Sequence, residues 1–460
     1  MKIICTICTF LFGVVVLLFF GWAYPHHLHY QEQYQLFLFD STYVWEIIKQ
    51  PGGVADLLGR FCTQFFLYAW VGAFIIALLL SMVQLLLLRL VKDGWFYGLS
   101  FVPSFLLWIF LLDENALLSG VWAVLLTLLI TWVIFRWSKG WVRYVLLIVA
   151  IPLLYFLVGP VCLPIPVDSL WHGIHYYRYP ADFPWFLWAA SLSVFAIAGT
   201  FLFFHRAYHR TVPSMVLSSA IVATGMGIFV WKNSNFKAEK VMQYDFMARY
   251  QQWNRILETI NDEKPNNQIG VTVQNLALAK HGMLLDHMFE YNQNGILGLL
   301  PDVGTDAISP LPTSEAFYQL GMITIAQRTV FEAQEAILDF QKSGRCYKRL
   351  AQTNLILGSY EVARKYLKAL QKTLFYREWA SETLPLLGNE EAIAKHPEYG
   401  RLRQMLYTDD FYFGDHVGPE MLERLYFRNT ENRMAYQYLV AYYLLTGDRE
   451  SLNHFISVTR

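Results

Sequence analysis

Charged residues are scarce in this sequence. Asp, Glu, Lys and Arg together make up 16% of the 460 residues, against about a quarter in a typical soluble domain. The scarcity is uneven, because most of the charge follows residue 231 and the long apolar runs precede it. An entirely soluble chain is therefore excluded, and the first half is expected to lie in a membrane.

Other features are missing as well. The formal net charge is zero, which gives no indication of a nucleic-acid partner. The five cysteines form no metal-type Cys-x-x-Cys pair in a soluble loop, so a disulfide framework is not expected. No phosphate-cradling Gly loop, nucleophile elbow or zinc-protease motif is present. No charged residue stands in mid-span, which argues against a proton- or ion-coupled transporter.

The apolar runs predict an all-α, polytopic membrane domain over residues 1–231. About seven transmembrane helices are expected, over 3–23, 62–88, 95–112, 116–135, 144–163, 185–204 and 212–231. The first run is also compatible with a cleaved signal peptide that starts at Lys2 and is cut near Ala23. A helical soluble domain is expected over 232–460.

Lysine and arginine in the short loops predict the orientation. If the N-terminus is cytoplasmic, the cytoplasmic side carries most of these residues, namely Lys2, Arg89, Lys92, Arg136, Lys139, Arg143, Arg206 and Arg210. The opposite side carries fewer, namely Lys49, Arg60 and Arg178. Seven spans then place the C-terminal domain outside. In a Gram-negative bacterium this means an inner-membrane protein, in contact with membrane lipids, with a periplasmic domain.

The soluble domain shows helical periodicity with no convincing strand. Apolar stripes predict helices over about 272–291, 314–341, 346–357, 360–375 and 434–445. The segment 355–363 resembles the turn of a tetratricopeptide repeat, where Gly358 separates two helices and Tyr360 and Ala363 open the second. Weaker copies occur around Gly447 and Gly282. The resemblance implies a degenerate α-solenoid with a concave surface for a protein or peptide partner.

The first external loop, residues 24–61, is the most informative segment. It is too long for a simple turn and too apolar for a flexible linker, so two amphipathic helices on the membrane surface are expected. Glu32 and Asp40 lie in this loop just after the first span. Their carboxylates would lie at the membrane surface.

This order of parts resembles the C-type membrane glycosyltransferases, which use polyprenyl-phosphate-linked sugar donors. In that superfamily a seven-span core carries an acidic first external loop with surface helices, and several members add external tetratricopeptide repeats. The resemblance covers the whole chain and implies Glu32 or Asp40 as catalytic base or metal ligand, with Asp113 and Glu114 as a second acidic motif. Gln31-Glu32-Gln33 stands where members carry an Asp-Glu pair. The chain also resembles an uncharacterised bacterial family of multi-pass proteins with a repeat-like tail, which supplies no activity.

The third external loop would supply the remaining parts of such a site. A carboxylate would deprotonate the acceptor hydroxyl, while a divalent cation or Arg178 would stabilise the departing lipid phosphate. The aromatic residues of the same loop would stack on sugar rings, namely Trp171, Tyr176 and Tyr177. Histidines in the two loops are candidate metal ligands, namely His172 and His175 with His26, His27 and His29.

Each candidate also has a purely structural interpretation. Glu32 and Asp40 would cap helices or contact headgroups, Asp113-Glu114 would be a polar turn between spans, and the loop-three aromatics would form an interfacial belt. Two hypotheses therefore stand. One is a glycosyltransferase whose repeat domain presents the acceptor. The other is a non-enzymatic, membrane-anchored scaffold for assembling envelope proteins.

Overall fold

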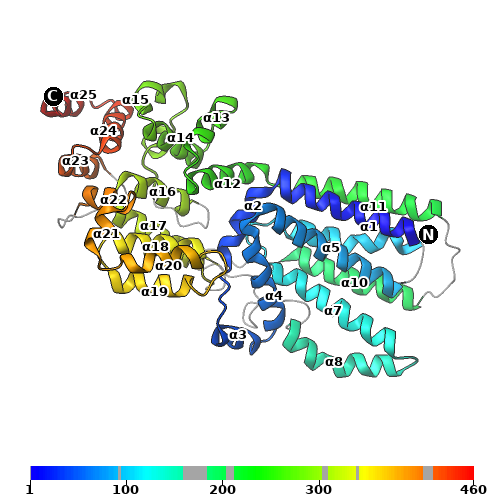
Figure 1. The fold of residues 1–460 in the computed structure, drawn as a ribbon. Helices are drawn as coiled ribbons and strands as arrows, with labels where there is room; N and C mark the ends of the chain where they lie inside the picture. Colours follow the sequence, from blue (N-terminus) through cyan, green and yellow to red (C-terminus); the bar gives the residue numbers. More distant parts are fainter. Residues whose placement is uncertain are drawn as a thin grey trace. The chain divides into compact units, whose positions relative to one another are not determined.

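The computed structural model is entirely helical where it describes the chain. It describes residues 2–91, 95–158, 184–203, 212–302, 309–337, 341–407 and 418–459. Within these ranges every regular element is a helix and none is a strand, so the predicted all-α class is confirmed. Two compact units divide the chain (Figure 1). The N-terminal unit includes Met1–Glu239, and the C-terminal unit includes Lys240–Ile337 and Lys342–Arg460.

The N-terminal unit contains the apolar helices and the helices of the first loop. In chain order these are α1 (Lys2–Leu18), η1 (Phe19–Ala23), α2 (Pro25–Gln31), η2 (Glu32–Tyr34), α3 (Ser41–Ile48), α4 (Gly53–Thr63), η3 (Gln64–Leu67), α5 (Ala69–Val91), η4 (Trp95–Phe101), α6 (Val102–Phe110), α7 (Leu118–Trp137), α8 (Val142–Val158), α10 (Trp185–Phe203) and α11 (Val212–Asn233). The first loop is thus largely helical, as its amphipathic pattern predicts.

Four helices are long and apolar enough to cross a membrane, namely Ile3–Ala23, Ala69–Leu90, Leu118–Trp137 and Pro213–Asn233. Shorter apolar helices stand near the other three predicted spans, namely Tyr97–Phe110, Val142–Leu154 and Trp185–Ala198. The count of seven, the inner membrane and the orientation therefore remain predictions. The second span begins later than predicted, at Ala69, because the backbone is extended at Tyr68 and separates it from α4 and η3.

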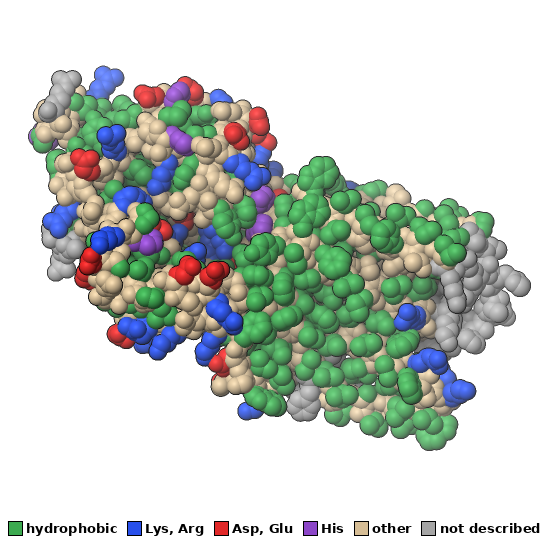
Figure 2. Space-filling view, in the orientation of Figure 1, with side chains coloured by type: hydrophobic (Ala, Val, Ile, Leu, Met, Phe, Trp, Pro, Cys, Tyr) green, Lys and Arg blue, Asp and Glu red, His purple; other side chains and the backbone are tan. Residues whose placement is uncertain are grey.

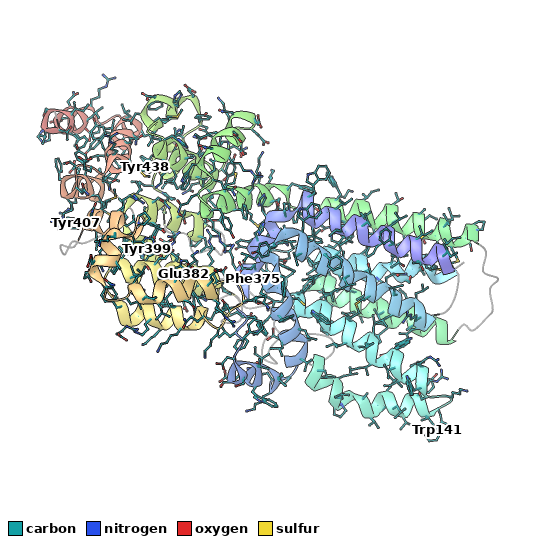
Figure 3. The ribbon with its side chains drawn as sticks, viewed as in Figure 1. Trp141, Phe375, Glu382, Tyr399, Tyr407 and Tyr438 are labelled. Atoms are coloured by element: carbon teal, nitrogen blue, oxygen red, sulfur yellow. The ribbon has the colours of Figure 1, made fainter. Side chains whose placement is uncertain are left out.

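The surface of the N-terminal unit fits a membrane environment. Hydrophobic side chains cover most of its visible face in Figure 2. Only 11% of the apolar window in α11 is buried inside the protein, so most of its apolar surface needs lipid. Tryptophans near helix ends are strongly exposed, including Trp137 at 85% and Trp141 at 73%, the latter labelled in Figure 3. Such positions are typical of interfacial anchors.

A buried polar network ties α1, α5 and η4 together. Gln84 is fully buried, accepts a hydrogen bond from Thr9 Oγ1 at 2.9 Å and donates one to Ser100 Oγ at 2.9 Å. Tyr97 Oη donates to the carbonyl of Cys5 at 2.9 Å. These bonds satisfy polar groups that would be costly to leave unpaired in an apolar core.

Close backbone contact fixes α4 of the first loop against α7. A Cβ atom added at Gly59 would lie 2.6 Å from the backbone nitrogen of Ser119, so no larger residue fits without a shift of the helices. We expect Gly59→Ala to destabilise the N-terminal unit by about 1–3 kcal/mol, the range for overpacking. Thermal unfolding of the detergent-solubilised chain measures this. Gly227→Ala in α11 is the control, because nothing lies within 4 Å of its added Cβ. Equal melting temperatures for the two variants would contradict the close approach.

The C-terminal unit is built from short helices. These are α12 (Phe236–Arg249), which begins in the N-terminal unit, then α13 (Trp253–Asp262), α14 (Gln268–Lys280), α15 (Leu284–His287), η6 (Met288–Glu290), η7 (Gly295–Gly298), α16 (Pro310–Leu320), α17 (Ile323–Glu335), α18 (Gly344–Ile356), α19 (Tyr360–Leu370), α20 (Arg377–Thr383), η9 (Leu384–Leu386), α21 (Glu390–Lys395), α22 (Tyr399–Met405), α23 (Pro419–Arg428), α24 (Arg433–Thr446) and α25 (Arg449–Thr459).

Consecutive helices of this unit pack as pairs. Helix α16 packs on α17, α18 on α19 and α23 on α24. The turn predicted at Gly358 separates α18 from α19, with glycine in the left-handed region at φ +80°. The single helix predicted over 314–341 is wrong, because Gly321 at φ +95° ends α16 and a new helix starts at Ile323. The helix pairs are observed, whereas the tetratricopeptide-like solenoid remains a prediction.

Candidate functional site

The first loop of the N-terminal unit packs on the turn that follows α6. His27 Nε2 lies 2.8 Å from the carbonyl oxygen of Leu111. Gln31 Nε2 donates to the carbonyls of Asp113 at 3.2 Å and Ala116 at 3.4 Å. Helix α2 therefore brings loop one and the Asp113-Glu114 turn together, although about 80 residues separate them in sequence.

A second contact joins the same helix to the start of α12. The carboxylate of Glu239 accepts the backbone N–H of His26 at 2.8 Å and that of His27 at 2.9 Å. Nearby, the Asn235 backbone N–H donates to Tyr24 Oη at 3.1 Å. The N–H groups of His26 and His27 belong to the first turn of α2, where a helix leaves its backbone donors unsatisfied. Glu239 thus anchors the beginning of loop one.

We call this group the loop-one junction and define it by Tyr24, His27, Gln31, Glu114 and Glu239. Burial raises the pKa of Glu239 to about 7, against the opposing effect of its two N–H donors. Burial also raises the pKa of Glu114, and Asp113 adds to the effect. The carboxylate of Glu114 also disfavours ionisation of Glu239.

His27 is neutral at pH 7 because burial lowers its pKa to about 4. A carbonyl oxygen only accepts hydrogen bonds, so Nε2 must carry the proton shared with Leu111. The other ring nitrogen, Nδ1, is then an acceptor. It is buried without a hydrogen-bond partner among the described residues.

The structure assigns different surroundings to the four predicted carboxylates. Glu32 lies in η2 and is 5% exposed. Asp40 is the N-cap of α3 and accepts the backbone N–H groups of Thr42 and Tyr43 at 3.0 and 3.2 Å. Asp113 is exposed and accepts the Asn115 backbone N–H at 2.8 Å. Glu114 is half-buried at the junction, and burial raises its pKa.

The remaining candidates lie outside the described residues. They belong to the third external loop, namely Arg178, Trp171, Tyr176, Tyr177, His172 and His175. Among described residues, no group of three His, Cys, Asp or Glu side chains could hold a metal ion. The described residues of the junction therefore do not form a site for the divalent cation that the resemblance implies.

Glu239 and Tyr24 are junction residues that sequence reasoning missed. Glu239 follows the last predicted span and was grouped with the soluble domain. The only local signal was an acidic residue in the first turn of a helix next to the membrane. Its partners lie more than 210 residues away, so periodicity could not reveal the contact.

Comparison with known proteins adds the family. A model described as a family of unknown function, DUF6057, matches residues 1–460. The chain belongs to the DUF6057 family. No curated protein and no solved structure matches this DUF6057 member. The resemblance to a family without assigned activity is thereby supported, whereas the resemblances to glycosyltransferases and tetratricopeptide proteins stay predictions.

Proposed function

We propose that this DUF6057 member is a membrane glycosyltransferase that uses a polyprenyl-phosphate-linked sugar. The observation that carries the proposal is the loop-one junction, where the acidic turn after α6 meets a helical first loop next to the membrane-crossing helices. Glu114 is the proposed general base, because it is half-buried and burial raises its pKa towards neutrality.

The proposed reaction is a single displacement. The acceptor hydroxyl oxygen attacks the anomeric carbon and forms the glycosidic bond. The bond between that carbon and the phosphate oxygen breaks, and its electron pair leaves with the polyprenyl phosphate. Glu114 takes the proton of the hydroxyl. Glu239 and His27 do not touch substrate in this scheme, because both are buried and hold helix α2 in place.

The test uses the full chain in lipid nanodiscs with a panel of radiolabelled polyprenyl-phosphate hexoses and pentoses. Released polyprenyl phosphate is measured with membrane extract as the acceptor source. We expect Glu114→Gln to lower turnover by about 10²–10⁴-fold, the usual contribution of a general base. Glu46→Gln is the matched control, since Glu46 is an exposed carboxylate of the same loop. No turnover by the unmodified chain with any donor, or equal rates in both variants, would remove the proposal.

The scaffold is the alternative. It is supported by the packed helix pairs of the C-terminal unit, because stacked pairs of helices commonly present a surface that binds a protein. On this alternative Glu114→Gln has no effect, while substitutions on the C-terminal unit abolish recovery of a cross-linked partner. The effects of these two kinds of substitution therefore distinguish the glycosyltransferase from the scaffold.

A further inference from the structure

Among its described residues, the C-terminal unit contains a group of cations that outnumber the carboxylates beside them. We call it the central basic cluster and define it by Lys280, Lys348, Arg349 and Arg401. They come from α14, α18 and α22, and each interacts electrostatically with other members or with the carboxylates Glu315 and Glu398. Tyr399, labelled in Figure 3, lies beside Glu398 at the start of α22. Four cations thus face two carboxylates.

The carboxylates are already engaged. Glu315 forms the ion pair with Arg349 and also accepts a hydrogen bond from Gln319 Nε2 at 2.8 Å. Glu398 accepts one from Tyr318 Oη at 2.8 Å. Among the described residues, no carboxylate forms an ion pair with Lys280, Lys348 or Arg401. Within the described part of the unit, the four cations of the cluster therefore outnumber these two carboxylates by two charges.

The free donors of the cluster point to a ligand. Lys348 Nζ lies 4.9 Å from the ring centre of Trp379 and has no hydrogen bond among described residues. Arg349 stacks on Tyr318, with 3.7 Å from its guanidinium carbon to the ring centre, and its Nη1 is buried without a partner in the described part of the unit. Among the described residues, Lys280 Nζ donates to one acceptor, the amide oxygen of Gln319 at 2.5 Å. Arg349 Nη1 is thus a buried donor without an acceptor among the described residues, which is costly, and the two lysines of the cluster are half-buried. An anion that accepts from these groups would therefore stabilise the unit.

The pKa values of the two lysines are lowered, as expected for cations that lie close together and partly buried. Burial lowers the pKa of Lys348 to about 8, with Arg249 and Arg349 next in importance. Burial also lowers the pKa of Lys280 to about 8, with Arg401 next in importance. Glu315 and Glu398 oppose both shifts without cancelling them. A solvated surface cluster would not lose its charge so readily.

We propose that the central basic cluster binds a phosphate group, carried as a phosphomonoester dianion. The two negative charges of a phosphomonoester would balance the two surplus positive charges, whereas a single carboxylate would balance one of them. Arginine and lysine donors of this kind bind phosphate oxygens through charge-assisted hydrogen bonds. The proposal does not depend on the glycosyltransferase hypothesis, because it rests on a different unit.

The experiment uses the full chain in an uncharged detergent at pH 7.5, with ionic strength held constant by sodium chloride. Inorganic phosphate, glycerol 3-phosphate and micellar phosphatidic acid are titrated separately, with phosphatidylcholine as the lipid blank. We expect saturable heat by calorimetry and a rise in melting temperature that follows occupancy. Binding of glycerol 3-phosphate identifies a soluble source of the phosphate, and binding of phosphatidic acid alone identifies a lipid headgroup.

Lys348→Met and Arg401→Met are expected to weaken the affinity by about tenfold or more each, the loss of one charge-assisted bond. Lys395→Met is the control, because that lysine is 75% exposed and pairs with Glu391. Two variants are used so that misfolding of one leaves the test intact. Absence of saturable binding by all three phosphates, or equal affinity in the cluster and control variants, would overturn the proposal.

Discussion

Replacing Glu239 by alanine is expected to destabilise the loop-one junction by about 2–4 kcal/mol at pH 5. The substitution removes the acceptor for two backbone N–H groups, those of His26 and His27. A buried donor left without an acceptor costs about 1–3 kcal/mol. Hydrogen-exchange protection of the amides at 26 and 27 measures the loss directly. Glu46→Ala, an exposed carboxylate of the same loop, is the control and should leave these amides protected.

The same substitution should change the pH dependence of stability. Glu239 has a pKa of about 7 when folded, against 4.5 ordinarily, so the folded state holds the proton more tightly than the unfolded state. Stability from this group is complete below about pH 4.5 and is lost as the pH rises through about 7, a change of about 3 kcal/mol. The difference in stability between wild type and Glu239→Ala should therefore narrow by most of that amount between pH 5 and 8. A gap that stays constant, or amides that remain protected in the variant, would show that Glu239 does not anchor α2.

Local pattern was sufficient for the helices that are long and apolar enough to cross a membrane. Four of the predicted spans correspond to long helices, because a run of about 20 apolar residues has few alternatives in a membrane. The Gly358 turn was likewise predictable, since glycine tolerates the left-handed conformation that ends α18. Gly321 carries the same conformation, yet the apolar pattern continues across it, so a single helix was predicted where two exist.

The site was less predictable, because it depends on contacts between distant segments. Asp113 and Glu114 were identified from their position between two apolar runs, and the structure adds that loop one packs against them. Glu239 could not be connected to His26 and His27 by any local rule. The capping role of Asp40 was one of two interpretations, and the N–H donors of Thr42 and Tyr43 now supply its partners.

Removing Asp245 is expected to be the most damaging single change in the C-terminal unit. Arg345 donates to both carboxylate oxygens of Asp245, at 2.5 and 2.7 Å, and the two side chains are only 9% and 6% exposed. Asp245→Ala leaves the guanidinium buried without its carboxylate, which typically costs about 3–5 kcal/mol. Urea unfolding of the detergent-solubilised full chain, with proteolysis of the C-terminal unit as the readout, measures the loss of stability.

A double variant decides what the pair contributes. If the cost of Asp245→Ala arises from the loss of this carboxylate beside the buried guanidinium, then Asp245→Leu with Arg345→Met should recover most of the stability, because apolar residues often replace a buried ion pair at little cost. Glu361→Ala is the control and should cost less than about 1 kcal/mol, since its pair with Arg364 is exposed. If the double variant is instead as unstable as Asp245→Ala, neutralising the buried charge does not restore stability. The two hydrogen bonds between Asp245 and Arg345 would then be what holds α12 against α18.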